Sequence, residues 1–268
     1  MHRLDGKVAI VTGGGTGIGR AAALMLAGEG AEVVIAGRRK PALDAVVSEI
    51  EHAGGRAAAR VTDLEHDDEA AELGRWTAER FGRVDVLVNN AGHSSRVRNI
   101  RWVSRAEWDS VLAVNLTAVY ALTQAVLPSM LARGEGTIVT IASLAAIRPG
   151  LLSGAPYGAA KAAVRNLMAS VHATLRNSGI RATTILPAEV DTPILDRRPL
   201  PPDASARATM MKPEDVAAAI LFCVTLPART VIEEIVMSPT FQRDVTADLE
   251  AGRHEGKPSP SGTVRGDV

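Results

Sequence analysis

The arrangement of apolar residues along this chain constrains its fold more than any other feature. Short, continuously apolar runs alternate with longer amphipathic stretches from the N-terminus to about residue 240. A strand that is apolar on both sides must be covered on both faces, which is typical of parallel strands joined by helices. We therefore expect an α/β fold with a doubly wound parallel sheet of about seven strands, a Rossmann-like single domain.

The same pattern predicts the individual elements. Strands are expected at residues 7–12, 32–36, 56–61, 85–89, 136–141, 181–186 and 230–237. Helices are expected at residues 17–30, 41–53, 67–81, 104–131, 155–178 and 213–225. No linker or internal repeat interrupts this alternation, so we predict one domain over residues 1–240. The remainder, 241–268, is polar and rich in Gly, Pro, Ser and Asp, and is predicted to be a mobile tail, with a role at a subunit contact as the alternative.

Composition excludes several classes of function. Lysine and arginine balance aspartate and glutamate at 30 each, which argues against nucleic acid or an anionic membrane as a partner. The six histidines are dispersed without a ligand-pair spacing, so no metal site is expected. The one cysteine, Cys223, lies in an apolar run and is expected to be buried. Because it has no partner for an intrachain disulfide, we expect a reducing, cytoplasmic environment.

A glycine-rich turn joins the first predicted strand to the first predicted helix. Gly13, Gly17 and Gly19 follow a GxxxGxG spacing within residues 12–19. Glycines at such a turn let the backbone approach a pyrophosphate, whose charge is met by the helix N-terminus. A glycine-rich loop alone is weak evidence, but its place directly after the first strand predicts a dinucleotide site.

Tyr157 and Lys161 lie four residues apart in the predicted helix 155–178. Four residues are about one helical turn, so both side chains project from the same face. A lysine ammonium at that distance favours the phenolate and is predicted to lower the tyrosine pKa from about 10. A phenol tuned in this way suits a general acid or base. The alternative is two unrelated residues at helical spacing.

With these features the chain resembles the short-chain dehydrogenase/reductase family over roughly residues 4–240. The resemblance rests on the order and spacing of the glycine turn, Asn89-Asn90-Ala91-Gly92, Asn115, Ser143, Tyr157 with Lys161, and Pro187 with Thr192. It implies that the 1–240 domain binds both a nicotinamide cofactor and a substrate. It also implies reversible hydride transfer between a secondary alcohol and a ketone, or an aldehyde, as in a carbonyl reductase.

The resemblance assigns catalytic roles to four residues. Tyr157 would donate a proton in reduction and accept one in oxidation, while Ser143 would hold the substrate oxygen beside the phenol. Lys161 would also hydrogen-bond the nicotinamide ribose, and Asn115 would anchor a water that relays protons. On the residues alone, Ser143 is as well explained as a strand-end hydroxyl bonded to local backbone. Asn115 is better explained, on the same ground, as an ordinary polar residue within a helix.

The resemblance also implies a set of cofactor contacts. The glycine turn, the adenine and ribose side of the groove, and the segment after the sixth strand each contribute to it. The implied contacts are Gly13, Gly15, Thr16, Gly17, Ile18, Gly19, Arg38, Arg39, Asp63, Leu64, Asn90, Gly92, Tyr157, Lys161, Pro187, Val190 and Thr192.

The end of the second strand indicates which nicotinamide cofactor is used. NAD-preferring relatives carry an acid near the position of Gly37, whereas this chain continues into Arg38 and Arg39. Guanidinium groups without a competing carboxylate suit a 2′-phosphate, which favours NADP, with Arg38 as the main contact. The alternatives are a solvated basic turn and an NAD-linked alcohol dehydrogenase. Gly15 stands where many NADP-preferring relatives have a basic residue, and this weakens the argument for NADP.

Several features depart from the family pattern or leave two interpretations open. Ala188 replaces the usual glycine after Pro187, and Glu189 and Asp191 are expected at a solvated rim. His93 is expected to border the site without a catalytic role. Residues 195–209 are predicted to cover the substrate. Arginines in two segments either meet a substrate anion or form solvated loop faces, the more ordinary case: Arg96, Arg98, Arg101, Arg105, Arg197, Arg198 and Arg207.

The expected function is therefore hydride transfer between NADP(H) and a small alcohol or carbonyl compound, with reduction favoured by NADPH. The rival is a nucleotide-binding regulator without turnover, which the intact set of four catalytic residues argues against. Relatives usually form dimers or tetramers through two long helices, here about 104–131 and 155–178, so a homo-oligomer is expected.

Overall fold

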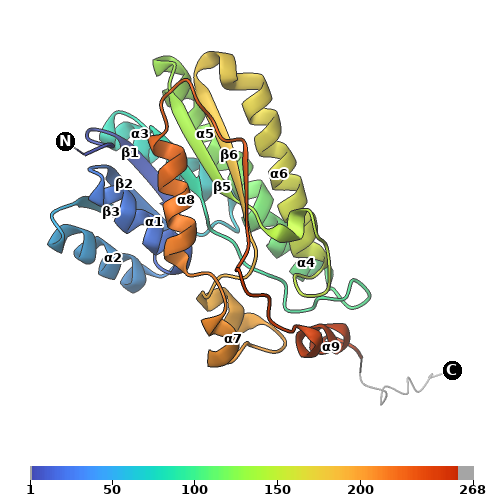
Figure 1. The fold of residues 1–268 in the computed structure, drawn as a ribbon. Coiled ribbons are helices and arrows are strands. Elements are labelled where there is room, and N and C mark those ends of the chain that lie inside the picture. The colour runs from blue at the N-terminus through green and yellow to red at the C-terminus, as the bar shows by residue number, and fades with distance from the viewer. Residues whose placement is uncertain (1, 259–268) are drawn as a thin grey trace.

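Seven parallel strands form one sheet in the computed structural model, which describes residues 2–258. Their order is β3-β2-β1-β4-β5-β6-β7. Helices cover both faces of the sheet, as Figure 1 shows. The predicted α/β class and the doubly wound, seven-stranded sheet are thus confirmed.

The strands and helices lie close to the predicted ranges. The strands are β1 Val8–Thr12, β2 Glu32–Gly37, β3 Arg56–Val61, β4 Val86–Asn89, β5 Gly136–Ile141, β6 Ile180–Pro187 and β7 Glu234–Met237. The helices between them are α1 Gly17–Gly28, α2 Lys40–His52, α3 Asp67–Phe81, α4 Arg105–Leu112, α5 Ala118–Arg133, α6 Ala155–Leu175 and α8 Pro213–Thr225. Further short elements are η1 Ala113–Thr117, η2 Leu144–Ala146, η3 Arg176–Ser178, η4 Pro193–Arg197, α7 Ala204–Ala208 and α9 Thr246–His254.

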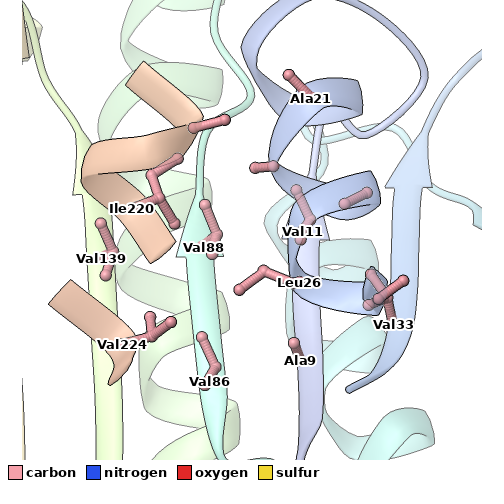
Figure 2. Close-up of a cluster of buried hydrophobic side chains, with 14 of the residues drawn as sticks. Ala9, Val11, Ala21, Leu26, Val33, Val86, Val88, Val139, Ile220 and Val224 are labelled. Atoms are coloured by element: carbon pink, nitrogen blue, oxygen red, sulfur yellow. The ribbon is translucent and has the colours of Figure 1, made fainter. Parts of the chain in front are cut away.

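Two apolar cores hold the layers together, one on each face of the sheet. Figure 2 shows part of the first core, where Ile220 and Val224 of α8 lie over Val86, Val88 and Val139 of the sheet. Successive residues of a strand point to opposite faces, so a continuously apolar strand supplies both cores. The burial of every residue of β1, β4 and β5 follows from this arrangement.

The strand order reverses beside β1, and this reversal positions the site. β1 pairs with β2 on one side and with β4 on the other, so the connections that leave their carboxyl ends diverge. In open α/β sheets a crevice forms outside the carboxyl ends of the strands at such a point. The residues that follow β1 and β4 therefore face the same space.

The long predicted helix 104–131 is present but contains a change of winding. A π-helical turn, η1, separates α4 from α5, and π turns within α-helices often mark functional sites. By length and apolar composition alone, the continuous stretch Arg105–Arg133 is long enough to cross a membrane. Half of its most apolar 18-residue window is buried within the fold, where α5 packs against α3, as expected of a core helix.

The segment after β7 differs from the predicted mobile tail. Residues 241–258 include the helix α9, which lies with α7 beyond one end of the sheet (Figure 1). Arg243 anchors this segment by ion pairs to Glu189 and Asp248, and Arg96 pairs with Glu255. Charged residues of this segment thus form ion pairs with the domain. The part of the predicted tail at 259–268 lies outside the described residues.

Asp85 joins the start of β4 to neighbouring elements at the amino ends of the strands. Its carboxylate accepts hydrogen bonds from the Val8 amide at 2.9 Å and from Arg83 at 2.6 and 2.7 Å. The residue is buried. Burial raises the pKa of this carboxyl, but the hydrogen bonds from Arg83 and Val8 outweigh it, and the pKa stays below its ordinary value of 3.8.

We expect Asp85→Asn to lower the free energy of unfolding by about 2 kcal/mol, because charge-assisted hydrogen bonds to a buried carboxylate are lost. Urea denaturation at pH 7 measures this loss. The contribution of a carboxyl with a depressed pKa is present above pH 3.8 and disappears as the pH falls through the lower folded value, so the deficit should shrink in acid. Asp109→Asn removes an exposed i,i+4 pair with Arg105 and should change stability by less than about 0.5 kcal/mol. Equal effects of the two variants would contradict the anchoring role.

Candidate active site

A cavity of about 690 Å³ opens at the carboxyl ends of the strands. It is lined by segments that follow β1, β2, β4, β5 and β6, together with the start of α6. Most of the predicted site residues line it: Gly13, Gly15, Thr16, Gly17, Ile18, Arg38, Arg39, Asn90, Gly92, Ser143, Tyr157, Lys161, Pro187, Val190 and Thr192. Four predicted residues do not contribute to the wall: Gly19, Asp63, Leu64 and Asn115.

The glycine turn requires glycine for two different reasons. Gly13 and Gly17 have φ values of +66° and +54°, in the left-handed region that favours glycine. Gly19 instead lies where a β-carbon would be 2.5 Å from Asn90 Nδ2 and in collision with the Gly13 carbonyl. Gly19 thus allows α1 to pack against the turn, and it shapes the cavity from behind its wall.

Thr12 holds the ends of β1 and β4 together. Its hydroxyl donates to the Val88 carbonyl at 3.3 Å and accepts from the Asn90 and Ala91 amides at 3.0 Å each. The Asn90 side chain donates in return to the Thr12 carbonyl at 2.9 Å. Asn90 therefore supports the glycine turn as well as lining the cavity. Thr12 was not among the predicted site residues, although its hydroxyl at a buried strand end was a visible signal.

The N-terminus of α1 faces the cavity through Thr16, Gly17 and Ile18. Thr16 makes no side-chain cap, and the first turn of α1 carries no acidic residue. The first amides of a helix have no intrahelical acceptor and carry partial positive charge. An anion such as a pyrophosphate fits this end of the cavity.

Two arginines line the same end of the cavity beyond β2. Arg38 is half-exposed, and its guanidinium lies 3.5 Å from Glu65. Arg39 occupies the N-cap position of α2. Gly37 itself lines the cavity and supplies no carboxylate. This arrangement fits a phosphate group on the ribose of a dinucleotide.

Asp63 and Leu64 lie behind this end of the cavity. The Asp63 amide donates to Glu69 at 2.8 Å, while its carboxylate accepts from the Glu65 amide at 3.1 Å. Leu64 is buried in the second core. Their predicted contact with adenine stays a prediction.

Tyr157 and Lys161 project from the first turns of α6 into the cavity, as the spacing predicted. Lys161 Nζ lies 5.5 Å from the centroid of the tyrosine ring. It donates to the Ile141 carbonyl at 2.7 Å, which ties α6 to the end of β5. Burial lowers the pKa of Lys161 to about 8, because desolvation disfavours the ammonium.

The pKa of Tyr157 is raised above its ordinary value by burial. The Ser143 hydroxyl and, at longer range, the guanidinium groups of Arg98 and Arg198 act in the opposite direction without cancelling it. This corrects the prediction that Lys161 brings the phenol pKa down, because desolvation is the larger effect here. The phenol is therefore protonated at neutral pH, the form that donates a proton.

Ser143 and Asn115 both show local hydrogen bonds. The Ser143 hydroxyl accepts from the Ala145 amide at 3.2 Å, the local backbone bond expected of a strand-end hydroxyl, and the residue also lines the cavity. Its contact with a substrate oxygen stays a prediction. Asn115 lies in the π turn and donates to the carbonyls of His93 and Val111, each at 2.9 Å. Within residues 2–258 its buried Oδ1 accepts no hydrogen bond.

Gly92 brings Asn115 and Lys161 to the same place. A β-carbon on Gly92 would lie 2.6 Å from Asn115 Oδ1 and 3.5 Å from Lys161 Nζ. Two polar groups thus face Gly92, with Lys161 on the cavity wall and Asn115 behind it. His93, which follows, lines the cavity while its ring is 3.1 Å from the Ser110 carbonyl, and no catalytic role is indicated.

Glu189 is not a solvated rim residue, contrary to the prediction, whereas Asp191 is partly exposed and ion-paired. Glu189 accepts from Arg198 at 2.6 Å and from Arg243 at 2.8 Å, and its side chain is only 16% exposed. Asp191 pairs with Arg207 at 3.1 Å and with Lys212 at 3.0 Å. Positively charged residues from distant segments converge on them, which the local sequence does not reveal.

The other arginines, for which the sequence left two interpretations, lie in different environments. Arg96 and Arg105 form surface ion pairs, and Arg101 lies over the Trp102 ring at 4.7 Å. Arg197 is exposed at the cavity edge. Arg98 alone among residues 96, 98, 101 and 105 lines the cavity, and it is buried. Among residues 2–258 no cluster of three or more potential metal ligands occurs.

Several known proteins are similar to this chain. The model of the family described as short chain dehydrogenase matches residues 7–201. An uncharacterised oxidoreductase of Staphylococcus aureus is 34% identical over 89% of this chain and all of its own. The 3-oxoacyl-(acyl-carrier-protein) reductase FabG of Thermotoga maritima is 33% identical over 87% of this chain and 96% of its own.

Two solved structures extend the similarity to three dimensions. A metagenomic short-chain oxidoreductase in complex with NADP is 35% identical, with a TM-score of 0.78, and the match covers 90% of this chain and all of that one. A 3-ketoacyl-(acyl-carrier-protein) reductase from Brucella melitensis complexed with NADH is 30% identical, with a TM-score of 0.79, over 88% of this chain and 98% of that one.

Proposed function

This chain belongs to the short-chain dehydrogenase family, and on that premise we propose that it transfers a hydride between NADP(H) and a secondary alcohol or ketone, or an aldehyde, of a small molecule. Tyr157 serves as general acid and base. One observation carries the proposal: Tyr157, Ser143 and Lys161 line the same cavity as the glycine turn. A nucleotide-binding regulator would not need a phenol and a hydroxyl at the far end of that cavity.

The reaction follows from what the chain places around the substrate. When bound, the reduced nicotinamide supplies a hydride with its electron pair to the carbonyl carbon and is left oxidised. The carbonyl π electrons then move to the oxygen, which takes the proton of the Tyr157 phenol and becomes the alcohol hydroxyl. Ser143 stabilises the charge that develops on this oxygen. Oxidation is the reverse and requires the phenolate.

Lys161 and Asn115 return a proton to the phenol. Lys161 carries a pKa of about 8, so it can both give and take a proton near neutral pH. Asn115 Oδ1 is a free acceptor beside the same glycine as Lys161 Nζ, which suits a water held between them and solvent. One hydrogen of Lys161 Nζ is donated to the Ile141 carbonyl, and the others are available for hydrogen bonds to the nicotinamide ribose.

We propose NADP as the preferred cofactor, with NAD as the alternative. The glycine turn and the N-terminus of α1 hold the pyrophosphate, and Arg38 with Arg39 binds the 2′-phosphate. Support comes from the absence of a carboxylate at Gly37 and from the two arginines on the cavity wall. A related structure contains NADP, and another contains NADH.

Replacing Tyr157 by Phe should reduce kcat for carbonyl reduction by about 10²-fold or more, because the proton donor is removed. NADPH binding, followed by fluorescence titration, should change little. The measurement is the rate of NADPH oxidation with a broad panel of ketones and aldehydes.

Tyr120→Phe is the matched control, since Tyr120 is the other tyrosine of the chain and lies half-exposed on α5. Its kcat should equal that of the parent. Turnover by Tyr157→Phe at the parental rate would refute the mechanism. Tight NADPH binding by the parent without turnover of any panel member would favour the regulator.

The parent enzyme should use NADPH with at least about tenfold higher kcat/KM than NADH, and Arg38→Ala should remove most of this preference. The expected size is that of a charge-assisted hydrogen bond to phosphate. Arg75→Ala, which removes an exposed charge paired with Glu72, should leave the preference unchanged. A clear preference of the parent for NADH would refute the proposal for Arg38.

We further propose a cytoplasmic homodimer or homotetramer, assembled through Arg105–Arg133 and α6. The first of these exposes Tyr120 and Leu131, at 47% and 40% of their surface. Light scattering should give two or four times the chain mass of 28.1 kDa. A species of 28.1 kDa alone, or recovery of the protein mainly outside the cytoplasmic fraction, would contradict this proposal.

A further inference from the structure

Within residues 2–258, Arg98 is a buried guanidinium without a carboxylate partner. The residue is 3% exposed, and among residues 2–258 no acidic side chain lies within ion-pair distance of it. Other arginines of the surrounding loops, such as Arg96, Arg198 and Arg243, each have one. Burying a cation without a counter-charge is costly, and proteins rarely retain such a group unless something else meets its charge.

Two of its three nitrogen positions lack an acceptor. Arg98 Nη1 donates to the Ser153 carbonyl at 2.6 Å and to the Ser94 hydroxyl. Nε is buried without a hydrogen bond, and no acceptor for Nη2 occurs in the described part of the chain. Since Arg98 contributes to the cavity wall, Nη2 is the donor available to a molecule inside the cavity, whereas Nε is covered by the protein.

The chain holds this guanidinium in a fixed place. Gly154, with φ +82°, and Gly252 of α9 lie so close that a β-carbon on either would meet the Arg98 side chain at 2.9 and 3.3 Å. Glu107 accepts hydrogen bonds from the amides of Arg96 and Val97 at 2.6 and 3.0 Å and thereby ties down the loop. Its carboxylate is thus used by the backbone, and it does not pair with Arg98.

Arg98 also belongs to the substrate end of the cavity. It is close enough to Tyr157 to favour the phenolate electrostatically. Burial lowers its pKa to about 10, so it is charged at neutral pH. Arg198, which acts on the same phenol, is already neutralised by Glu189 at 2.6 Å. The uncompensated positive charge beside the reacting centre is therefore that of Arg98.

We infer that Arg98 binds an anionic group, a carboxylate in the first instance, carried by the substrate whose carbonyl is reduced beside Tyr157. The substrate class is then an oxo acid, or in the reverse direction a hydroxy acid. A charged guanidinium whose Nη2 has no acceptor within residues 2–258 suits a carboxylate oxygen, which supplies both the acceptor and the counter-charge. This inference rests on the proposed function and names the substrate class of the same site.

A competing explanation gives Arg98 a role only through the phenol, whose pKa it helps to restrain. The two explanations differ in their consequences. A charge that acts through Tyr157 alters the turnover of every substrate to the same extent. A charge that binds a carboxylate alters acids far more than neutral compounds.

The experiment compares linear 2-oxo, 3-oxo, 4-oxo and 5-oxo acids with their methyl esters, using NADPH and measuring kcat/KM. We expect the parent to prefer the acid at least tenfold for the member with the best spacing. Arg98→Gln should reduce that preference at least tenfold, and Arg98→Lys should restore part of it. Arg105→Gln removes an exposed charge outside the cavity and should leave the preference unchanged.

Different outcomes test the role of Arg98 and the proposed function separately. Turnover of esters by the parent without a preference for any acid overturns this inference alone. Equal losses for acid and ester in Arg98→Gln also overturn it, in favour of a role through Tyr157. Should Arg98→Gln fail to fold, the parent's acid preference and its reduction in Arg98→Lys decide. Absence of turnover with acids and esters alike overturns the proposed function, and this inference with it.

Discussion

The carboxyl ends of β1 and β4 lie close together where the order of the sheet reverses, and this proximity determines the shape of the site. The Thr12 hydroxyl contacts Val88, Asn90 and Ala91, so the ends of β1 and β4 are held within hydrogen-bonding distance. The turns that leave these ends must pass one another, and only glycine backbone allows it at Gly13 and Gly19. The shape of the cavity therefore depends on residues without side chains at these two positions.

Burial of charge governs the other end of the cavity. Desolvation raises the pKa of Tyr157 and lowers those of Lys161 and Arg98, so each group is pushed towards its neutral form. The phenol is kept as a proton donor, and the lysine is brought to a pKa at which it can exchange protons near neutral pH. The guanidinium stays charged, because its ordinary pKa is so high. Burial thus leaves Tyr157 protonated and Arg98 charged at neutral pH, and brings the pKa of Lys161 close to neutrality.

Ion pairs connect the C-terminal segment, residues 241–258, to the cavity. Arg243 bridges Glu189, which follows β6, and Asp248 of α9. α9 in turn places Gly252 against the stem of Arg98. A segment that is polar along its length thus becomes ordered by ion pairs with side chains far away in the sequence. Partly buried ion pairs with several partners hold position better than isolated surface pairs.

Local patterns in the sequence were enough to predict the α/β class, the seven parallel strands, the glycine turn, and the common face of Tyr157 and Lys161. These depend on periodicity and on spacing within one element, both of which are local. Four features became visible only in the folded chain: the pairing of Glu189, the packing of residues 241–258 on the domain, the burial of Arg98, and the upward shift of the Tyr157 pKa. Each of these depends on which charges and apolar surfaces meet across long chain separations, and on how much water they exclude when they do.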